Sequence, residues 1–263
     1  MTDIVVTPRR ALPGKPAGFT IAPLVATAAI LVIWEVATAY VVNPIWIARP
    51  SAIAERLWVL TSTGDLLRHT GFTVYHALAG LVLSIAVGVP IGILFGSFKA
   101  IALTFETLLL GFYSLPRIAL APLFILWFGI GEFSKIMMTF SMVVFVVILN
   151  TYEGLRGVDP ELIDMMRAMR APRHYILRKV QLPIIVPWVL ASIRVGIGLA
   201  LVGAVIGELL GANRGLGWYI EYSAARFDVV GVFAGLVVLM AVGMGLNEII
   251  NAFDNRVWRR RVA

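Results

Sequence analysis

Long apolar stretches that are nearly free of charge recur along the 263 residues of the chain. Each stretch is long enough, as a helix, to cross the roughly 30 Å hydrocarbon core of a bilayer. The alternating segments of about ten residues that are typical of a membrane β-barrel do not occur. The pattern therefore predicts an all-α membrane protein with about six transmembrane helices, at Ile21–Val42, Val74–Gly96, Ile101–Phe128, Ser134–Thr151, Ile184–Leu210 and Val229–Ala252.

Two features modify this simple pattern. Pro116 lies within the third predicted span, and an internal proline bends a helix and frees a carbonyl, so we expect a break there. The longest external loop, Asn43–Thr73, contains the stretch Pro50–Leu60, whose pattern fits a short amphipathic helix at the membrane interface.

One polar, basic segment, residues 159–183, separates the fourth and fifth spans; we call it the island. It begins like a helix, because Asp159 is a suitable N-cap and Pro160 suits the first turn. Apolar residues then recur at i, i+3, i+4 and i+7 and form one face, which we call the ridge: Leu162, Met165, Met166 and Met169. A partner's groove, the lipid surface or the chain's own bundle can bury such a face, and periodicity leaves these open.

Small residues repeat every four positions in two of the spans. Rows of small residues at this spacing let helix backbones approach closely in lipid. We therefore favour helix packing within the chain over a moving interface or a pore wall. The residues concerned are Gly88, Gly92 and Gly96 in the second span, and Gly203, Gly207 and Gly211 in the fifth.

Ionisable side chains at membrane depth are costly and need a reason. Arg117, Arg194 and Glu208 are our candidates for lining a translocation path. The alternative for each is an internal ion pair or a side chain that reaches the interface, and this alternative also applies to Glu106 and Glu248. For Glu35 the sequence indicates no partner.

Composition supports the membrane class, with 60% hydrophobic and 14% charged residues. If the N-terminus is cytoplasmic, 14 of the 22 Lys and Arg residues lie inside, six lie outside and two lie within spans. Positive residues favour the cytoplasmic side, so both termini and the island are expected there. The first apolar stretch is too long for a signal peptide and is read as an uncleaved span. The asymmetry also accounts for the net charge of +7 without a nucleic-acid partner.

Several kinds of chemistry have no residues to support them. The chain contains no cysteine, no G-x-x-x-x-G-K-[ST] phosphate loop, no H-E-x-x-H and no G-x-S-x-G. Its histidines, His69, His76 and His174, are scattered over different segments. We therefore predict no catalytic residues, no metal site and no cofactor in this chain, which leaves transport, anchoring or channel formation.

The island resembles the EAA loop of permease subunits in ABC importers. The family pattern is E-A-A, three residues, Gly, nine residues, Ile, one residue and Leu-Pro. The matching positions here are Asp164-Met165-Met166, Arg170, Val180 and Leu182-Pro183. Arg170 replaces a glycine that adopts positive φ without strain, so we expect the turn to shift towards Ala171-Pro172.

The resemblance extends over roughly residues 70 to 250. The stretch from Tyr113 to Gly131 is similar to the P-x-x-A-x-x-P-L-x-x-x-W-F-G signature of the nitrate, sulfonate, taurine and bicarbonate branch. Asn150–Gly154 followed by Val158-Asp159-Pro160 also fits, as does Gly207-Glu208-Leu209 leading to Gly215-Leu216-Gly217.

The resemblance implies a permease of a type I ABC importer in the bacterial inner membrane. Two copies would form the pore, two ATPase subunits would bind ATP and Mg, and a periplasmic or lipid-anchored binding protein would deliver a small solute. That solute would be an anion such as a sulfonate, nitrate, taurine or an aromatic acid. The island would be the coupling helix, contacting the ATPase through Asp159, Leu162, Asp164, Met165, Met166, Arg167, Met169 and Arg170.

The chain then divides into a cytoplasmic tail (1–20), a first span with its external loop (21–73), a core permease domain (74–253) containing the island, and a basic cytoplasmic tail (254–263). Two alternatives remain open. One is a membrane anchor or scaffold that docks a cytoplasmic partner, and the other is a stand-alone carrier, although the inverted halves typical of carriers are not found.

Overall fold

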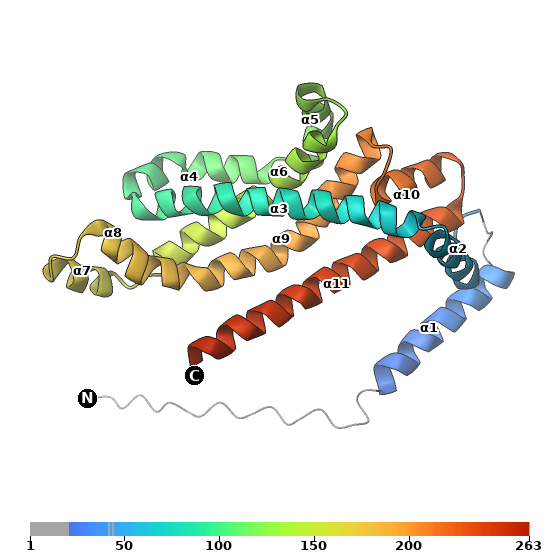
Figure 1. Ribbon diagram of the computed structural model, residues 1–263, viewed down its shortest axis with the longest axis horizontal. Helices are drawn as coiled ribbons and strands as arrows, with labels where there is room; N and C mark the ends of the chain where they lie inside the picture. Colours follow the sequence, from blue (N-terminus) through green and yellow to red (C-terminus); the bar gives the residue numbers. More distant parts are fainter. Residues whose placement is uncertain (1–20, 42, 44, 263) are drawn as a thin grey trace.

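The computed structural model describes residues 21–41, 43 and 45–262, and every regular element within them is a helix (Figure 1). The predicted N-terminal tail, 1–20, lies outside the described residues. The α-helices are α1 Ile21–Tyr40, α2 Pro50–Ser62, α3 Asp65–Ser97, α4 Lys99–Ser114, α5 Ala121–Phe128, α6 Glu132–Arg156, α7 Pro160–Ala168, α8 Arg173–Ile176, α9 Leu182–Gly211, α10 Leu216–Ala225 and α11 Val229–Val262. A 3₁₀ turn, η2 (Arg117–Leu120), precedes α5, and a π-helical turn, η3 (Leu177–Gln181), precedes α9. The all-α prediction is confirmed.

Five helical runs are long and apolar enough to cross a membrane, and the third predicted span is a bent pair. α4 and the η2–α5 segment meet at an angle of 84°, so the count is six if the pair is one span. The break lies at Leu115-Pro116, as predicted. Leu115 has the extended backbone (φ −62°, ψ 136°) that the ring of a following proline favours.

The structure also adds to what was predicted for the segments between the spans. α2 confirms the expected amphipathic helix, and its Ile53 packs with Ala234 of α11. α3 begins at Asp65, well before the predicted start at Val74, directly after Gly64 in the left-handed conformation (φ 80°). α10 was not predicted at all.

α6 lies between α3 and α9 and contacts both at very close range. A Cβ on Gly80 of α3 would lie 2.4 Å from the Cβ of Thr139 in α6. A Cβ on Gly203 of α9 would lie 2.7 Å from the Cα of the same threonine. The glycines of the predicted repeat in α3, Gly88, Gly92 and Gly96, continue this contact along α6. The predicted role of the small residues, helix packing within the chain, is therefore confirmed.

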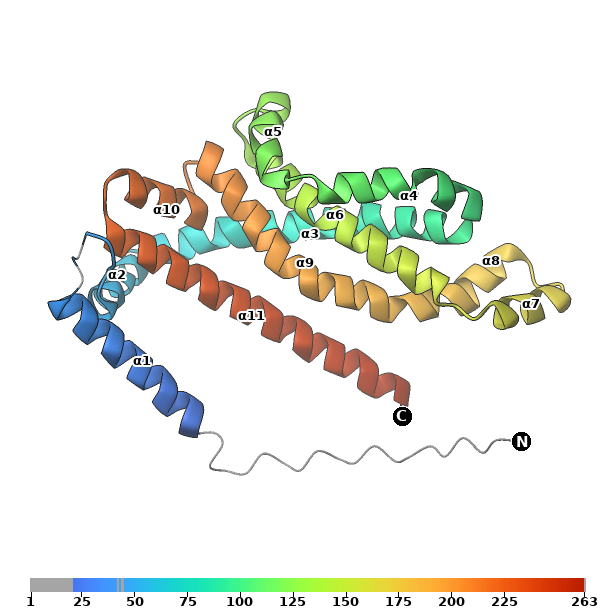
Figure 2. The ribbon, with the colours of Figure 1, turned by 180° about the vertical axis from the view of Figure 1, so that it is seen from behind.

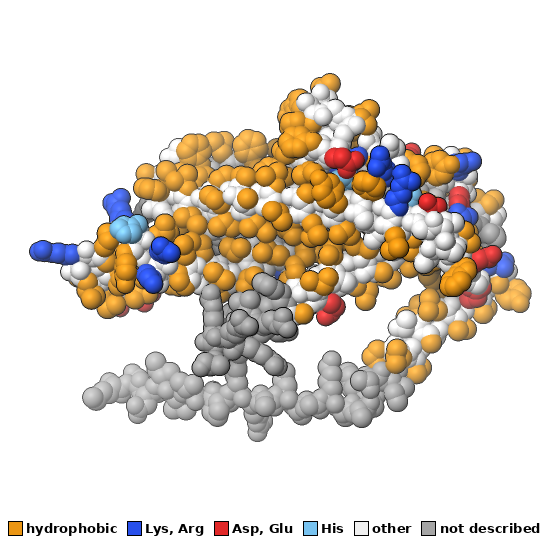
Figure 3. Space-filling model, viewed as in Figure 1, with side chains coloured by type: hydrophobic (Ala, Val, Ile, Leu, Met, Phe, Trp, Pro, Cys, Tyr) orange, Lys and Arg blue, Asp and Glu red, His pale blue; other side chains and the backbone are white. Residues whose placement is uncertain are grey.

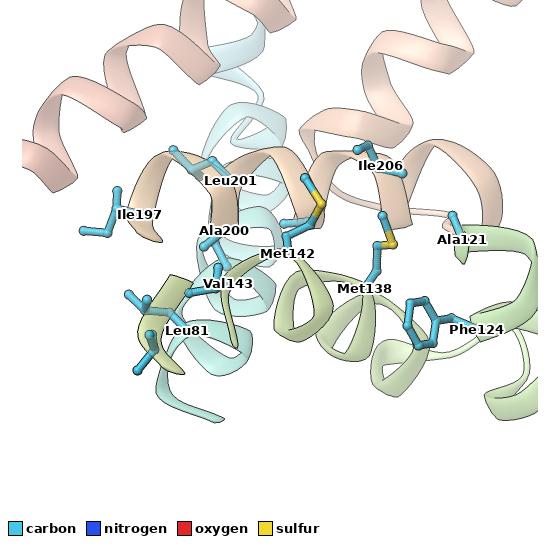
Figure 4. Close-up of a cluster of buried hydrophobic side chains, with 13 residues drawn as sticks. Leu81, Ala121, Phe124, Met138, Met142, Val143, Ile197, Ala200, Leu201 and Ile206 are labelled. Carbon is cyan, nitrogen blue, oxygen red and sulfur yellow. The ribbon is translucent and has the colours of Figure 1, made fainter. Parts of the chain in front are cut away.

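A buried hydrophobic cluster holds these three helices and α5 together (Figure 4). Leu81 of α3, Val143 of α6 and Ile197 of α9 lie close to one another in it, and Phe124 of α5 closes it near the break in the third span. The cluster comprises Ala77, Leu81, Ala121, Phe124, Met138, Met142, Val143, Val147, Ile197, Ala200, Leu201, Ala204 and Ile206.

The other elements lie at the ends and the periphery. α7 and α8 occupy one end of the molecule and α2 and α10 the other, as Figures 1 and 2 show from opposite sides. α1 diverges from the other helices and contacts α2. At this contact the Glu35 carboxylate accepts hydrogen bonds from the Ser51 N–H (3.0 Å) and hydroxyl (2.7 Å). α11 continues to Val262, so the last helix extends beyond the predicted end of the sixth span at Ala252.

Candidate docking site and membrane-depth polar clusters

α7 begins as its sequence predicts. The Asp159 carboxylate accepts a hydrogen bond from the Glu161 N–H (2.9 Å), and Pro160 occupies the first turn. The cap satisfies one of the N–H groups that a helix start leaves without a partner. A helix of only nine residues therefore has a defined start at the end of the molecule that carries the island.

The ridge on α7 is partly uncovered. Met165 is 54% exposed and Met169 73% exposed, while Leu162 and Met166 are half-buried. Beside the ridge, Asp164 and Arg167 form an exposed ion pair (3.1 Å). The chain's own bundle thus covers only part of this apolar face, and two flexible methionines remain available to a partner.

α7 ends in a Schellman motif with Arg170 at its left-handed position. The Ala171 N–H donates to the Met166 carbonyl (3.0 Å) and the Arg170 N–H to the Arg167 carbonyl (2.8 Å). Arg170 itself has φ +58°. The expected shift of the turn towards Ala171-Pro172 is therefore wrong. The two hydrogen bonds and the following Pro172 fix the turn at the position where the family has glycine.

The island is continuous with the fifth predicted span. α8, η3 and α9 form one helical run of 39 residues from Arg173 to Gly211. Pro183 lies inside this run, just after the π-helical turn η3, and a local π-turn is one way in which a helix accommodates a proline ring and its missing N–H. A displacement of α8 therefore reaches the membrane helix without an intervening loop.

At the opposite end of α9, Glu208 is fully buried and its carboxylate is fully engaged. Oε2 accepts hydrogen bonds from the Thr73 hydroxyl (2.9 Å) and the Gly217 N–H (2.9 Å), and Oε1 lies 2.8 Å from Nδ1 of His76. A path-lining role for Glu208 stays a prediction. In this structure its contacts are those of a buried structural acceptor.

His76 bridges two carboxylates from different helices. Its ring is 1% exposed, and Nε2 contacts Glu132 of α6 while Nδ1 faces Glu208 of α9. Glu132 also lies 3.6 Å from Nζ of the buried Lys135. A neutral imidazole can donate from only one of its two ring nitrogens. His76 can therefore donate to both carboxylates only when its ring carries a second proton. Four ionisable groups thus join α3, α6 and α9 near the end that carries α10.

The same cluster holds the first turn of α10. The Gly215 N–H donates to Nδ1 of His69 (3.1 Å) and the Leu216 N–H to Oγ1 of Thr73 (2.8 Å), next to the bond from Gly217 to Glu208. The sequence pattern did not predict this arrangement. The signal was His69, Thr73 and His76 at i, i+4 and i+7, a polar stripe that becomes one helix face once α3 starts at Asp65.

The two candidate arginines have different surroundings. Arg117 is half-buried and supports the break in the third span, donating to the carbonyls of Met142 (2.9 Å) and Tyr113 (3.0 Å). Its guanidinium also lies over the ring of Phe145, 5.2 Å from the centroid. Arg194 lies on α9 with an exposed side chain. Arg117 and Glu208 therefore belong to separate sites, and the roles of all three in a path stay predictions.

Comparisons with known proteins agree on one kind of protein. The family described as "Binding-protein-dependent transport system inner membrane component" matches residues 88–259. The putative aliphatic sulfonates transport permease protein SsuC of Bacillus subtilis is 32% identical over 253 residues, which is 95% of this chain and 92% of that protein. The formylaminopyrimidine transport permease protein ThiX of Halalkalibacterium halodurans is 31% identical over 234 residues, 88% of this chain and 93% of that protein.

A solved structure supports the fold. An inward-facing form of the MetNI methionine ABC transporter superposes with a TM-score of 0.61 at 22% identity, covering 72% of this chain and 92% of that one. The family match includes the island and every predicted span after the second.

Proposed function

The chain belongs to the family of inner membrane components of binding-protein-dependent transport systems, and on that premise we propose that two copies of it form the pore of an ATP-driven importer. Two ATPase subunits bind ATP and Mg on the cytoplasmic side, and an external binding protein delivers the solute. The permease itself supplies the path and the mechanical connection, and both its termini lie in the cytoplasm.

The observation that carries this proposal is the exposed part of the ridge on α7, which a short turn connects to the helical run that begins with α8 and enters the bundle. Met165 and Met169 are more than half exposed, and methionine adapts to the shape of a partner's groove. The capped start and the Schellman end hold α7 as one compact unit. ATP-driven movement of the ATPase subunits displaces α7, and the bundle tilts as a rigid body to alternate its access.

For the solute we propose a small anion. Support comes from the name of the Bacillus subtilis relative, an aliphatic sulfonate permease, and from the arginines at membrane depth. Arg117 carries its charge next to the bend of the third span, where its partners in this structure are two carbonyls and not a carboxylate. The binding protein selects the particular anion.

The docking role is tested by Met165→Asp, which places a charge in the centre of the ridge. We expect loss of co-purification of the ATPase while the helical content of the permease is unchanged. Met165→Leu keeps the apolar contact and serves as the matched control. Normal ATPase recovery with Met165→Asp would refute docking through this face.

The orientation has its own test, because the chain contains no cysteine. Single cysteines at Arg170 and at Arg226 should react with a membrane-impermeant maleimide from opposite sides. Labelling of both from the outside would contradict a cytoplasmic island.

A further inference from the structure

A groove of about 660 Å³ lies at the end of the molecule that carries the island. It is open between α7–α8 on one side and the turn from α3 into α4 on the other. Much of its floor is apolar, with contributions from Ile93, Phe98, Ile163 and Leu177. Small-ligand sites have volumes of about 300–1,000 Å³, so the groove is large enough for a molecule of that size.

The charge around this groove has one sign. Its basic lining residues are Arg167, Arg173 and His174, and none of the described lining residues is an Asp or a Glu. Figure 3 shows Lys, Arg and His side chains gathered at this end, beside hydrophobic surface. Arg167 is already paired with Asp164 (3.1 Å), so Arg173 and His174 are the donors most available to an anion.

The groove and the ridge lie on different faces of α7. Ile163 and Arg167 each follow a ridge residue by one position, which turns their side chains about 100° around the helix. A protein partner seated on Met165 and Met169 therefore leaves the groove side directed towards the ends of α3 and α4. In a membrane-spanning bundle, that is where the cytoplasmic headgroup layer lies.

We propose that this groove binds an anionic phospholipid of the cytoplasmic leaflet. The phosphate accepts hydrogen bonds from Arg173 and His174, and the upper part of an acyl chain lies on the apolar floor. A free phosphate would use the basic rim but leave the apolar floor exposed to water. The lipid would connect the α3–α4 turn to α7 and α8. This inference rests on the cytoplasmic placement of the island proposed above.

The test is native mass spectrometry of the purified full-length chain, titrated with phosphatidylglycerol or with phosphatidylcholine of the same acyl chains. We expect tighter binding of phosphatidylglycerol. The double variant Arg173→Gln/His174→Gln should reduce this preference by about fivefold or more, since a basic residue contributes about 1 kcal/mol to anionic-lipid binding. Arg178→Gln/Lys179→Gln removes exposed basic residues of the same segment that do not line the groove, and should leave the preference unchanged.

Three results would overturn the proposal. Equal binding of the two lipids would show a merely apolar surface. An unchanged preference in Arg173→Gln/His174→Gln would place the lipid elsewhere. Displacement by millimolar glycerol 3-phosphate would identify a site for a soluble anion instead. The measurement requires no ATPase and no transport, so its failure is distinguishable from failure of the proposed importer function.

Discussion

Arg170→Gly offers a sharp test of how the turn after α7 is built. Arg170 occupies the left-handed region (φ +58°) at the end of a Schellman motif, where a Cβ is unfavourable by roughly 1–2 kcal/mol. Glycine removes this strain but gains freedom in the opened loop, which offsets about 0.4–1 kcal/mol. The net effect is a stabilisation of the closed turn by about 0.5–1 kcal/mol, which corresponds to about a two- to fivefold shift in the opening equilibrium.

Hydrogen exchange of the island measures this opening directly. The amides of residues 170 and 171 close the motif through their hydrogen bonds to the carbonyls of Arg167 and Met166. In Arg170→Gly the exchange of these two amides should slow about two- to fivefold, once the rates are corrected for the effect of the substitution on intrinsic exchange. Arg170→Ala is the control, because it removes the charge but keeps the Cβ, and no slowing is expected. Unchanged exchange in Arg170→Gly, or equal slowing in Arg170→Ala, would refute the argument from backbone strain.

Three further substitutions test individual residues of the helix bundle. Glu208→Gln removes one partner of a buried charged cluster and should cost about 3 kcal/mol, lowering the melting temperature by about 6–12 °C; an unchanged melting temperature would exclude a buried contact with His76. Gly80→Ala forces α3 away from α6 and should cost about 1–3 kcal/mol, whereas Gly111→Ala, with nothing within 4 Å of its Cβ, should not melt below the unmodified chain. Arg194→Ala should reduce substrate-stimulated transport in proteoliposomes more than basal ATP hydrolysis, and equal loss of both would indicate a structural role.

The features that the sequence predicts well are those that depend on local chemistry. Apolar length predicts the spans, the ring of Pro116 predicts the break, and Asp159-Pro160 predicts the start of α7. The glycine repeats also predict close packing, because a missing side chain has the same meaning in any helix pair.

The features that the sequence predicts poorly depend on contacts between distant segments. His76 looks isolated along the chain, since its partners Glu132 and Glu208 lie 56 and 132 positions away. The turn at Arg170 shows a second limit. Local preference disfavours arginine there, but two backbone hydrogen bonds and Pro172, two residues further on, outweigh this preference.

The unbroken run from Arg173 to Gly211 has a mechanical consequence. Its 39 residues span about 60 Å at about 1.5 Å per residue, so a tilt of only about 5° about one end moves the other by about 5 Å. Because the glycines of α9 lie in close contact with α6 and α3, we expect the three helices to tilt together as one rigid unit. Glu208, near the end of α9 that lies away from the island, accepts a hydrogen bond from the Gly217 N–H in the first turn of α10 (2.9 Å), so a tilt of this run would also carry α10 with it.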